Sequence, residues 1–434
     1  MRSFEITTAF PRINKVPDPA IIVTTWEWYL LNHISSPLMQ YNHEEGRFSP
    51  LLAEDWSITG NQIRFRIKDT AMFSDGSSIT ANDVVASIKR LIIKRTATHF
   101  PVWEYFENCD SVKSMADHCS GINITDAHNV IFTLHKPVES FFLLMASPEG
   151  GIWSEKDIDM TSLEINPTKY SGPYILNEIR ENFLKLTKNS YSPIQKHFLN
   201  SPSQIISYSS TGDELQTLIK DKKIDVYIES IKPFLSGPYE EWGLKREVSV
   251  FSSILYLSRV GTHKKHFGKD FFDKLWVRSN FNDEMTAADT FLPFGSLGAL
   301  DKKFFYEELP DHSTSKEIKI AFLSSYFSEP LRNIIIEAGK QSGVKIIPVL
   351  TDIKETMSIV GSDIDNAKYD FVMAPYVASE RFPSVQLKFL LDGRKPPFEL
   401  ENLDLPNASV ERKKDLEKLQ RWMINTQTVL PLFF

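Results

Sequence analysis

The stretch FSDGSSITANDVVASIKRL, Phe73 to Leu91, combines a turn, a helix start and a helical repeat. Asp75-Gly76 predicts a tight turn, because glycine adopts positive φ without steric cost. Thr80 is placed to cap a helix, and Asp83 follows it three residues later as an acidic variant of the capping box. Apolar residues then recur at helical spacing from Val84 to Ile92. Because nothing in this stretch has a catalytic pattern, we predict that it is a scaffold.

The residues before this stretch predict a sheet with one face in water. QIRFRIKD (62–69) alternates apolar and basic side chains, which is typical of an antiparallel strand that buries one face. Further strands are predicted at 3–9, 130–134 and 183–187, and a helical segment at 21–39.

Residues 317–376 have a different pattern, in which apolar strands alternate with helices. The order is IKIAFLSS, EPLRNIIIEAGKQ, VKIIPVLT, IKETMSIV and YDFVMAPY. This β-α-β-α-β order predicts a parallel sheet with right-handed crossovers. Ser328 can cap the first helix and Gly343 can end it. Near the C-terminus, DLEKLQRWMINTQ predicts an amphipathic helix and VLPLFF a strand.

Size and composition narrow the class of protein. The chain has 434 residues, enough for two or three domains. Its net charge of −7 and the lack of a long basic run argue against a nucleic-acid partner. An aromatic content of 12% fits either a large core or the walls of a binding cleft. The most apolar run, SFFLLMAS, is too short to span a bilayer. No signal peptide is visible, so the protein is expected to be cytoplasmic or to have lost an export signal.

The sequence contains no strong catalytic or metal-binding signature. It lacks the phosphate-binding glycine loops and the common zinc-protease and serine-hydrolase motifs. His263 and His266 are spaced for half a metal site, but two lysines between them favour a solvated basic loop. Cys109 and Cys119 could form a small disulfide loop or be unrelated thiols. We therefore expect no catalytic residues, no metal and no cofactor, and a protein that is not an enzyme; a hydrolase remains a minor alternative.

Several phrases resemble one family in the same order along the chain. They are LLAEDWSI (51–58), RFRIKD with the opening stretch, KYSGPYIL (169–176), LIKDKKIDVYI (218–228), GVKIIPVL, YDFVMAPY and the closing LPLFF. The chain resembles the family 5 solute-binding proteins of bacterial ABC importers, which include oligopeptide, dipeptide and nickel receptors. One departure is Ser171, which stands where the family has the first glycine of G-x-G-P-Y.

The resemblance implies a fold and a division into domains. The fold would be α/β, of the type II periplasmic-binding-protein-like class, with two lobes joined by a hinge and an extra α+β domain. Lobe I would comprise 1–45, 166–250 and 405–434. The extra domain would comprise 46–165, and lobe III 251–404.

The resemblance also implies a function. The protein would be an extracytoplasmic receptor, periplasmic or membrane-anchored, that captures a small peptide or related polar solute in an interlobe cleft. It would act as a monomer, deliver the solute to an ABC permease in the membrane and bind no nucleic acid. The alternative is a cytoplasmic metabolite-sensing domain related to sugar-stress transcription regulators, without their DNA-binding part. The sequence does not identify the ligand.

The predicted ligand contacts come from three separated segments. Peptide-binding family members carry a W-x-x-D-Y-P-D-P-like phrase whose first Asp pairs with the peptide amine. Here the run is YVASERFP, in which Tyr376 replaces the Trp and Ser379 the Asp. A hydroxyl cannot replace the charge of that carboxylate. For Trp26 and Phe294 core packing is the alternative, and for Arg259 a solvated surface position. The full candidate set is Trp26, Glu27, Arg259, Phe294, Tyr376, Ser379 and Glu380.

Overall fold

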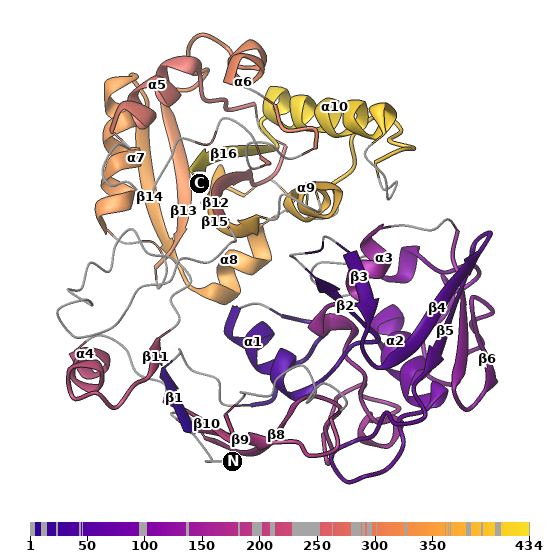
Figure 1. Ribbon diagram of the computed structural model, residues 1–434. Coiled ribbons are helices and arrows are strands. Elements are labelled where there is room, and N and C mark those ends of the chain that lie inside the picture. The colour runs from indigo at the N-terminus through magenta and orange to yellow at the C-terminus, as the bar shows by residue number, and fades with distance from the viewer. Residues whose placement is uncertain are drawn as a thin grey trace. The chain divides into compact units, whose positions relative to one another are not determined.

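The computed structural model divides into two compact units, Met1–Ser230 and Ile231–Phe434 (Figure 1). We refer to them as unit 1 and unit 2 and describe each by itself. The residues that the structure describes are 5–9, 15–22, 25–42, 45, 47–94, 102–135, 139–180, 183–192, 202–208, 213–227, 252–262, 264–278, 288, 291–292, 297–300, 302–324, 327, 329–360, 362, 364, 366–378, 383–391, 394–403 and 409–433.

The first sheet of unit 1 has the strand order β11-β1-β10-β9-β8. Its strands are β1 (Glu5–Ala9), β8 (Tyr174–Arg180), β9 (Phe183–Lys188), β10 (Gln204–Tyr208) and β11 (Val226–Tyr227). β1 runs parallel to β10 and β11, whereas β8, β9 and β10 form antiparallel pairs. Helices α1 (Thr25–Ile34) and α4 (Asp213–Lys220) belong to this part of unit 1. The core includes Leu30, Leu184 and Ile205, because α1 packs its apolar side against the sheet.

The second sheet of unit 1 is antiparallel, with the order β4-β5-β7-β6. Its strands are β4 (Ala53–Thr59), β5 (Gln62–Ile67), β6 (Ile122–Asp126) and β7 (Asn129–Thr133). Around it lie the hairpin β2 (Met39–Asn42) and β3 (Arg47–Pro50), helices α2 (Ala81–Lys94) and α3 (Glu139–Leu144), and the 3₁₀ turns η1 (Val102–Glu104), η2 (Pro148–Gly150) and η3 (Glu155–Asp157).

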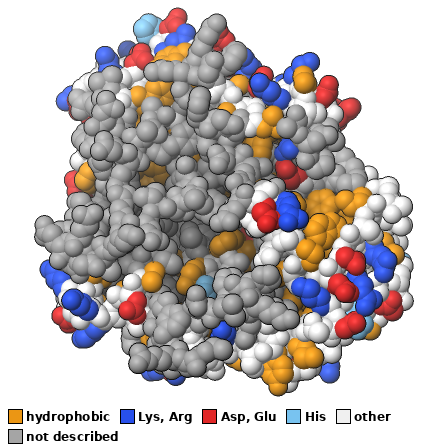
Figure 2. All heavy atoms as spheres, in the orientation of Figure 1, with side chains coloured by type: hydrophobic (Ala, Val, Ile, Leu, Met, Phe, Trp, Pro, Cys, Tyr) orange, Lys and Arg blue, Asp and Glu red, His pale blue; other side chains and the backbone are white. Residues whose placement is uncertain are grey.

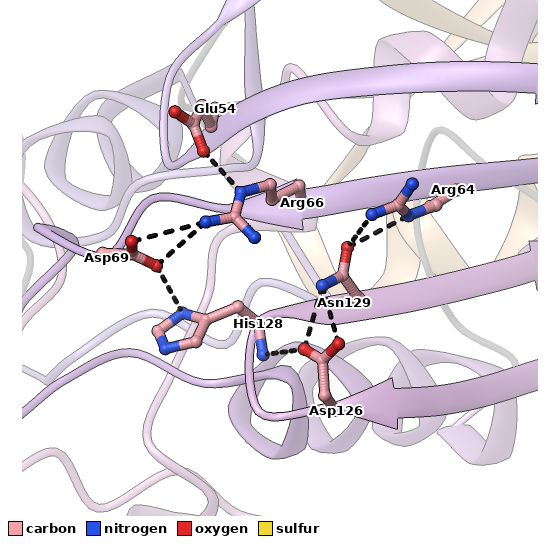
Figure 3. A network of polar contacts seen from close by, with 7 residues as sticks. All are labelled: Glu54, Arg64, Arg66, Asp69, Asp126, His128 and Asn129. Atoms are coloured by element: carbon pink, nitrogen blue, oxygen red, sulfur yellow. Dashed lines mark hydrogen bonds and ion pairs between the residues drawn. The ribbon is translucent and has the colours of Figure 1, made fainter.

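Strand β5 confirms the predicted one-sided pattern. Ile63, Phe65 and Ile67 are fully buried. On the other face, Arg66 donates to Glu54 at 2.6 Å, and Arg64 donates through two nitrogens to Asn129 (Figure 3). The period-2 alternation therefore separates a dry face from a face covered by polar contacts.

The opening stretch forms the predicted turn and helix. Gly76 has φ of +82°, which only glycine adopts without strain. The Asp83 carboxylate accepts from the amide and the hydroxyl of Thr80, both at 2.9 Å. It also accepts from the amide of Glu155 at 3.0 Å. Asp83 therefore supplies the acidic half of a capping box and also ties α2 to η3.

The same turn is joined to KYSGPYIL, which lies far away in the sequence. The amide of Ser74 donates to the carbonyl of Tyr170 at 2.9 Å, and the Tyr170 amide returns a bond to the Ser74 hydroxyl at 3.0 Å. Lys169 donates to Ser77 at 2.7 Å and lies over the Phe73 ring at 4.6 Å. Two of the phrases that carry the family resemblance thus form one substructure, which agrees with a scaffold role.

Ser171 fits its position in place of the family's glycine. Its side chain is 1% exposed. The hydroxyl donates to the carbonyl of Ile152 at 2.5 Å and accepts from the amide of Ser36 at 3.0 Å. Next to it, a Cβ on Gly172 would lie 2.4 Å from the carbonyl carbon of Ile34, so the end of α1 leaves no room there for a side chain. The substitution therefore adds two hydrogen bonds in a crowded, dry place.

Cys109 and Cys119 form a disulfide, which decides between the two alternatives from the sequence. Their Cα atoms lie 4.8 Å apart, and both side chains are buried. The closed loop also binds α2, because Lys89 donates to the carbonyl of Met115 at 2.6 Å and to that of Asp117.

Unit 2 is built on one mixed sheet with the order β14-β13-β15-β12-β16. The strands are β12 (Ser252–Arg259), β13 (Glu317–Leu323), β14 (Lys345–Thr351), β15 (Phe371–Ala378) and β16 (Val429–Phe433). β13 is parallel to β14 and β15, which confirms the β-α-β-α-β prediction. β12 is antiparallel to β15 and β16.

Helices cover both faces of this sheet. Figure 1 shows α5 (Lys269–Arg278) and α7 (Glu329–Gln341) on one side, and α9 (Pro383–Leu391) and α10 (Val410–Thr426) on the other. The remaining helices are α6 (Lys302–Glu308) and α8 (Ile353–Ile359). The expected end of α7 is confirmed, since Gly343 has φ of +77°. The expected cap Ser328 lies outside the described residues.

One helix boundary is wrong, and the domain bounds stay predictions. Residues 405–434 were expected in lobe I; in the structure α10 and β16 lie in unit 2, where β16 pairs with β12. All five residues of β16 are buried, because this apolar strand joins the unit 2 sheet next to β12. The helix expected at 21–39 is only α1, since Pro37 precedes the strand β2. The other predicted boundaries remain predictions.

Candidate functional site

The carboxyl ends of the parallel strands of unit 2 form the edge where α/β sheets commonly bind ligands. β13, β14 and β15 all end at this edge, because they run in one direction. Tyr376 lies near the end of β15, as the sequence analysis predicted, and is half-buried. Its ring stacks on that of Phe389 from α9, with centroids 4.4 Å apart and planes at 26°. Both rings are partly buried and also pack against the core of unit 2.

Phe389 was not among the predicted site residues. It lies in α9, which begins directly after YVASERFP, and this proximity in sequence is a signal that could have identified it. Three other predicted contacts, Phe294, Ser379 and Glu380, lie outside the described residues and stay predictions.

Arg259 is not brought to this edge. In the antiparallel pair of β12 and β15, Arg259 lies opposite Phe371 at the start of β15, whereas Ile254 lies opposite Tyr376. Five residues of strand separate the two positions, which is about 17 Å. Arg259 instead donates to the carbonyl of Thr426, the last residue of α10. Burial, together with the charge of Arg394, lowers the pKa of its guanidinium to about 10. A shared contact of Arg259 and Tyr376 with one small ligand group is therefore excluded by the register.

The two predicted ligand contacts of unit 1, Trp26 and Glu27, lie on α1 and differ in how far they are buried. Trp26 is 7% exposed and packs in the core with Trp153 and Tyr170, which agrees with the core alternative. Glu27, on the adjacent position, is half-buried. Trp28 is 41% exposed, so α1 presents a different indole to the surface.

A second aromatic group on α1 surrounds His33. Its ring lies 4.3 Å from that of Tyr29 and 5.5 Å from that of Tyr174. Nδ1 of His33 is 2.7 Å from the Tyr29 carbonyl, so this nitrogen carries the proton and donates it. Burial lowers the pKa of His33, and burial together with Tyr174 raises the pKa of Tyr29 to about 12. Both groups are neutral near pH 7, so this cluster offers packing and hydrogen bonding but no charge.

Hydrophobic side chains also gather on the surface of unit 1 over α3 and β3 (Figure 2). In this region Tyr41 and Phe48 lie edge to face at 5.0 Å, and Phe48 lies 5.9 Å from Phe142. Tyr41 and Phe48 are half-buried. These rings are a further candidate contact surface that no sequence motif indicated.

A shallow pocket of about 350 Å³ lies elsewhere in unit 1, against β8. It is lined by Val16, Asn166, Pro167 and Tyr170 and by residues 176–179. None of the predicted contacts lines it, so it is separate from the expected site.

Within the described parts of the chain, no group of three or more His, Cys, Asp or Glu side chains is arranged to hold a metal ion. His266 has its amide bonded to the Thr314 hydroxyl at 2.8 Å, and His263 lies outside the described residues. Among those same residues, no helix has the length and apolar character needed to cross a membrane.

The middle of the chain matches a known family model. Residues 47–240 match the model described as bacterial extracellular solute-binding proteins, family 5 Middle. The periplasmic murein peptide-binding protein MppA of Escherichia coli (strain K12) is 29% identical over 136 residues, which cover 30% of this chain and 25% of that protein. The chain therefore matches about a quarter of the length of this curated relative.

Solved structures extend the likeness to nearly the whole chain. Listeria monocytogenes OppA bound to peptide has a TM-score of 0.73 at 15% identity, over 100% of this chain and 93% of that one. A mannohexaose-bound oligopeptide-binding protein of Thermotoga maritima has a TM-score of 0.73 at 14% identity, over 100% and 91%. At this identity the comparison establishes the fold, and it confirms the type II periplasmic-binding-protein-like class.

Proposed function

We propose that the chain is a family 5 bacterial extracellular solute-binding protein and a receptor for a small peptide or related polar solute, which the match of residues 47–240 to that family's model supports. It captures the solute outside the cytoplasm and delivers it to an ABC permease in the membrane. The names of the relatives support a peptide, and the mannohexaose-bound neighbour supports keeping other polar solutes in the proposal. We further propose that the receptor acts as a monomer and without nucleic acid, in keeping with its net charge of −7.

The observation that carries this proposal is the aromatic pair of Tyr376 and Phe389 at the carboxyl edge of the unit 2 sheet. Ligand sites favour aromatic walls, because a ring offers a large apolar surface with little conformational entropy to lose. The pair can therefore stack on an apolar side chain of a peptide or on the apolar face of a sugar. Ser379 and Glu380, just beyond β15, remain proposed polar contacts of the same site.

The disulfide between Cys109 and Cys119 supports an extracytoplasmic location. Disulfides persist in oxidising compartments and are rare in the cytoplasm. This favours the receptor over the cytoplasmic sensor domain, and the relatives named above include no such sensor.

A thermal-shift screen with dialysed full-length protein tests the proposal. The panel contains di- to hexapeptides, manno-oligosaccharides and sugar phosphates. A bound ligand raises the melting temperature because it stabilises the folded state by RT ln(1 + [L]/Kd). The proposal fails if no member of the panel raises it and mass spectrometry finds no small molecule carried through purification.

Variants of the aromatic pair link any binding to the proposed site. Tyr376→Ala should remove the shift, whereas Tyr191→Ala should keep it, because Tyr191 is an exposed aromatic residue of unit 1. Equal loss in both variants would place the binding surface elsewhere.

A further inference from the structure

The shallow pocket against β8 in unit 1 shares no residue with the proposed solute site. Its volume of about 350 Å³ falls in the range of small-molecule sites, which begins at roughly 300 Å³. Such sites combine an apolar wall with a few polar groups. Here the apolar wall is formed by Val16, Pro167, Leu176 and Ile179.

An irregularity in β8 builds one side of this pocket. β8 is the edge strand of its sheet, and its pairing with β9 shifts register between Leu176 and Glu178, which leaves Asn177 as an extra residue. In a regular strand successive side chains point to opposite faces, whereas a bulge turns the strand and re-aims its side chains. This explains why four consecutive residues, 176–179, all line the pocket.

Tyr170 gives the pocket a buried polar group that has no partner. The residue is 7% exposed, and its ring packs in the core of unit 1 with Trp26 and Trp153. Its amide donates to the Ser74 hydroxyl, but its own hydroxyl makes no hydrogen bond among the described residues. Burial, together with the charge of Asp157, raises the pKa of Tyr170, so its hydroxyl keeps its proton near pH 7. The pocket therefore offers a ligand a neutral hydroxyl that can donate or accept.

The charges at the pocket favour a cation. Asp157, which acts on Tyr170, is 6% exposed and accepts only from neutral donors, the amide of Thr168 at 3.1 Å and its hydroxyl at 2.6 Å. Glu178 lines the pocket and pairs with Arg180 at 2.5 Å, but both side chains are exposed, and such surface pairs are weak. None of the described residues that line the pocket is a lysine or an arginine.

We propose that this pocket binds a small organic cation that carries an ammonium group on an apolar chain. The ammonium group contacts the Glu178 carboxylate and the Tyr170 hydroxyl, and the chain lies on the apolar wall. The first contact is a charge-assisted hydrogen bond, and the second removes apolar surface from water. This site goes beyond the proposed receptor function and does not depend on it.

Isothermal titration calorimetry on the dialysed full chain tests the site. The probes are n-hexylamine, 1-hexanol and hexanoate at pH 7 and constant ionic strength, which share an alkyl chain and differ in the charge of the head group. We expect one hexylamine per chain. Hexanol and hexanoate should bind about tenfold more weakly or not at all, because neither can form the charged bond to Glu178.

Glu178→Gln should weaken hexylamine binding by about tenfold, since it removes the charge of the carboxylate. Glu54→Gln is the matched control. It also removes a surface carboxylate of unit 1 that pairs with an arginine, Arg66 at 2.6 Å, but Glu54 does not line the pocket. This variant should bind hexylamine like the wild type.

Tyr170→Phe is a second variant, which keeps the ring in the core and removes only the hydroxyl. It should also bind hexylamine more weakly than the wild type. Weaker binding in either folded variant, with unchanged binding in Glu54→Gln, supports the proposal. Equal binding by the wild type and both variants overturns it, as does hexanoate that binds as tightly as hexylamine or the absence of hexylamine binding. Peptide binding in the same variants reports separately on the receptor function.

Discussion

Arg90 and Asp18 are joined by an ion pair in which Nη2 of the arginine lies 2.6 Å from Oδ2 of the aspartate. Arg90 is on α2 and 1% exposed, whereas Asp18 belongs to the segment before α1 and is partly exposed. Arg90 also donates from Nε to the carbonyl of Leu163 at 2.6 Å, and Lys94 adds a second contact to Asp18 at 2.8 Å. One carboxylate thus connects the N-terminal segment to the helix of the opening stretch.

Asp18→Asn should destabilise unit 1 strongly. It leaves the guanidinium of Arg90 buried without its anion, and breaking such a pair costs about 3 kcal/mol. Chemical denaturation followed by tryptophan fluorescence measures this loss. Glu54→Gln is the control, because Glu54 pairs with Arg66 at the surface and such pairs contribute about 0.5 kcal/mol. Similar losses in the two variants would contradict the assigned role of Asp18.

The same ion pair predicts a loss of stability in acid. Burial alone would raise the pKa of Asp18, but hydrogen bonds and charge from Arg90, with Lys94, lower it below the ordinary 3.8. The stabilisation is therefore complete above about pH 4 and is lost as the pH falls through the lower folded-state pKa. The melting temperatures of the wild type and Asp18→Asn should differ by a constant amount from about pH 6 to pH 4 and should converge as the pH falls further. A difference that stays constant throughout acid unfolding below about pH 4 would refute the prediction.

Ser171→Ala should lower the free energy of unfolding by about 2 kcal/mol. The alanine leaves the carbonyl of Ile152 and the amide of Ser36 without the hydroxyl that joins them in the dry interior. Urea unfolding gives the difference. Ser57→Ala on the exposed face of β4 should be nearly neutral, and an equally small effect at Ser171 would show that water replaces its hydroxyl.

Reduction of the disulfide should weaken the protein moderately. Cys109 and Cys119 are separated by ten positions, and a loop of this size contributes about 3 kcal/mol or less. The oxidised protein should show no reactive thiols when denatured, and two after reduction. Two reactive thiols before reduction would contradict both the disulfide and the argument from it about location.

Phe389→Ala should reduce ligand affinity by about tenfold, because it removes the support under the Tyr376 ring. Affinity for the best ligand of the thermal-shift screen gives the measurement. Phe398→Ala is a suitable control, since Phe398 packs against Trp422 instead. Unchanged affinity in Phe389→Ala would show that the aromatic pair is only structural.

Local patterns could be predicted well, because each depends on residues close together in the chain. The turn at Gly76, the contact of Asp83 with Thr80, the one-sided strand β5 and the alternation of strands and helices around β13 to β15 are all confirmed. The position of Tyr376 at a strand end followed from the same alternation.

Predictions that depended on long-range pairing were less successful. In the sequence, both Arg259 and Tyr376 come at the end of an apolar strand. The sequence does not show that these strands, β12 and β15, are antiparallel, which places Arg259 and Tyr376 at opposite edges of the sheet. Similarly, VLPLFF predicts a strand without identifying its neighbour, which in the structure is β12 of unit 2.

The sequence by itself determined many of the local elements and their order and carried the resemblance to one family, because helix caps, turns and apolar periods are set by neighbouring residues. The tertiary structure decided which side chains come into contact. Cys109 bonds to Cys119, the ring of Tyr376 stacks on that of Phe389, and Arg259 lies close enough to Arg394 for its pKa to be affected. These contacts depend on strand register and on how helices and loops pack, and the pattern of a single sequence does not specify either.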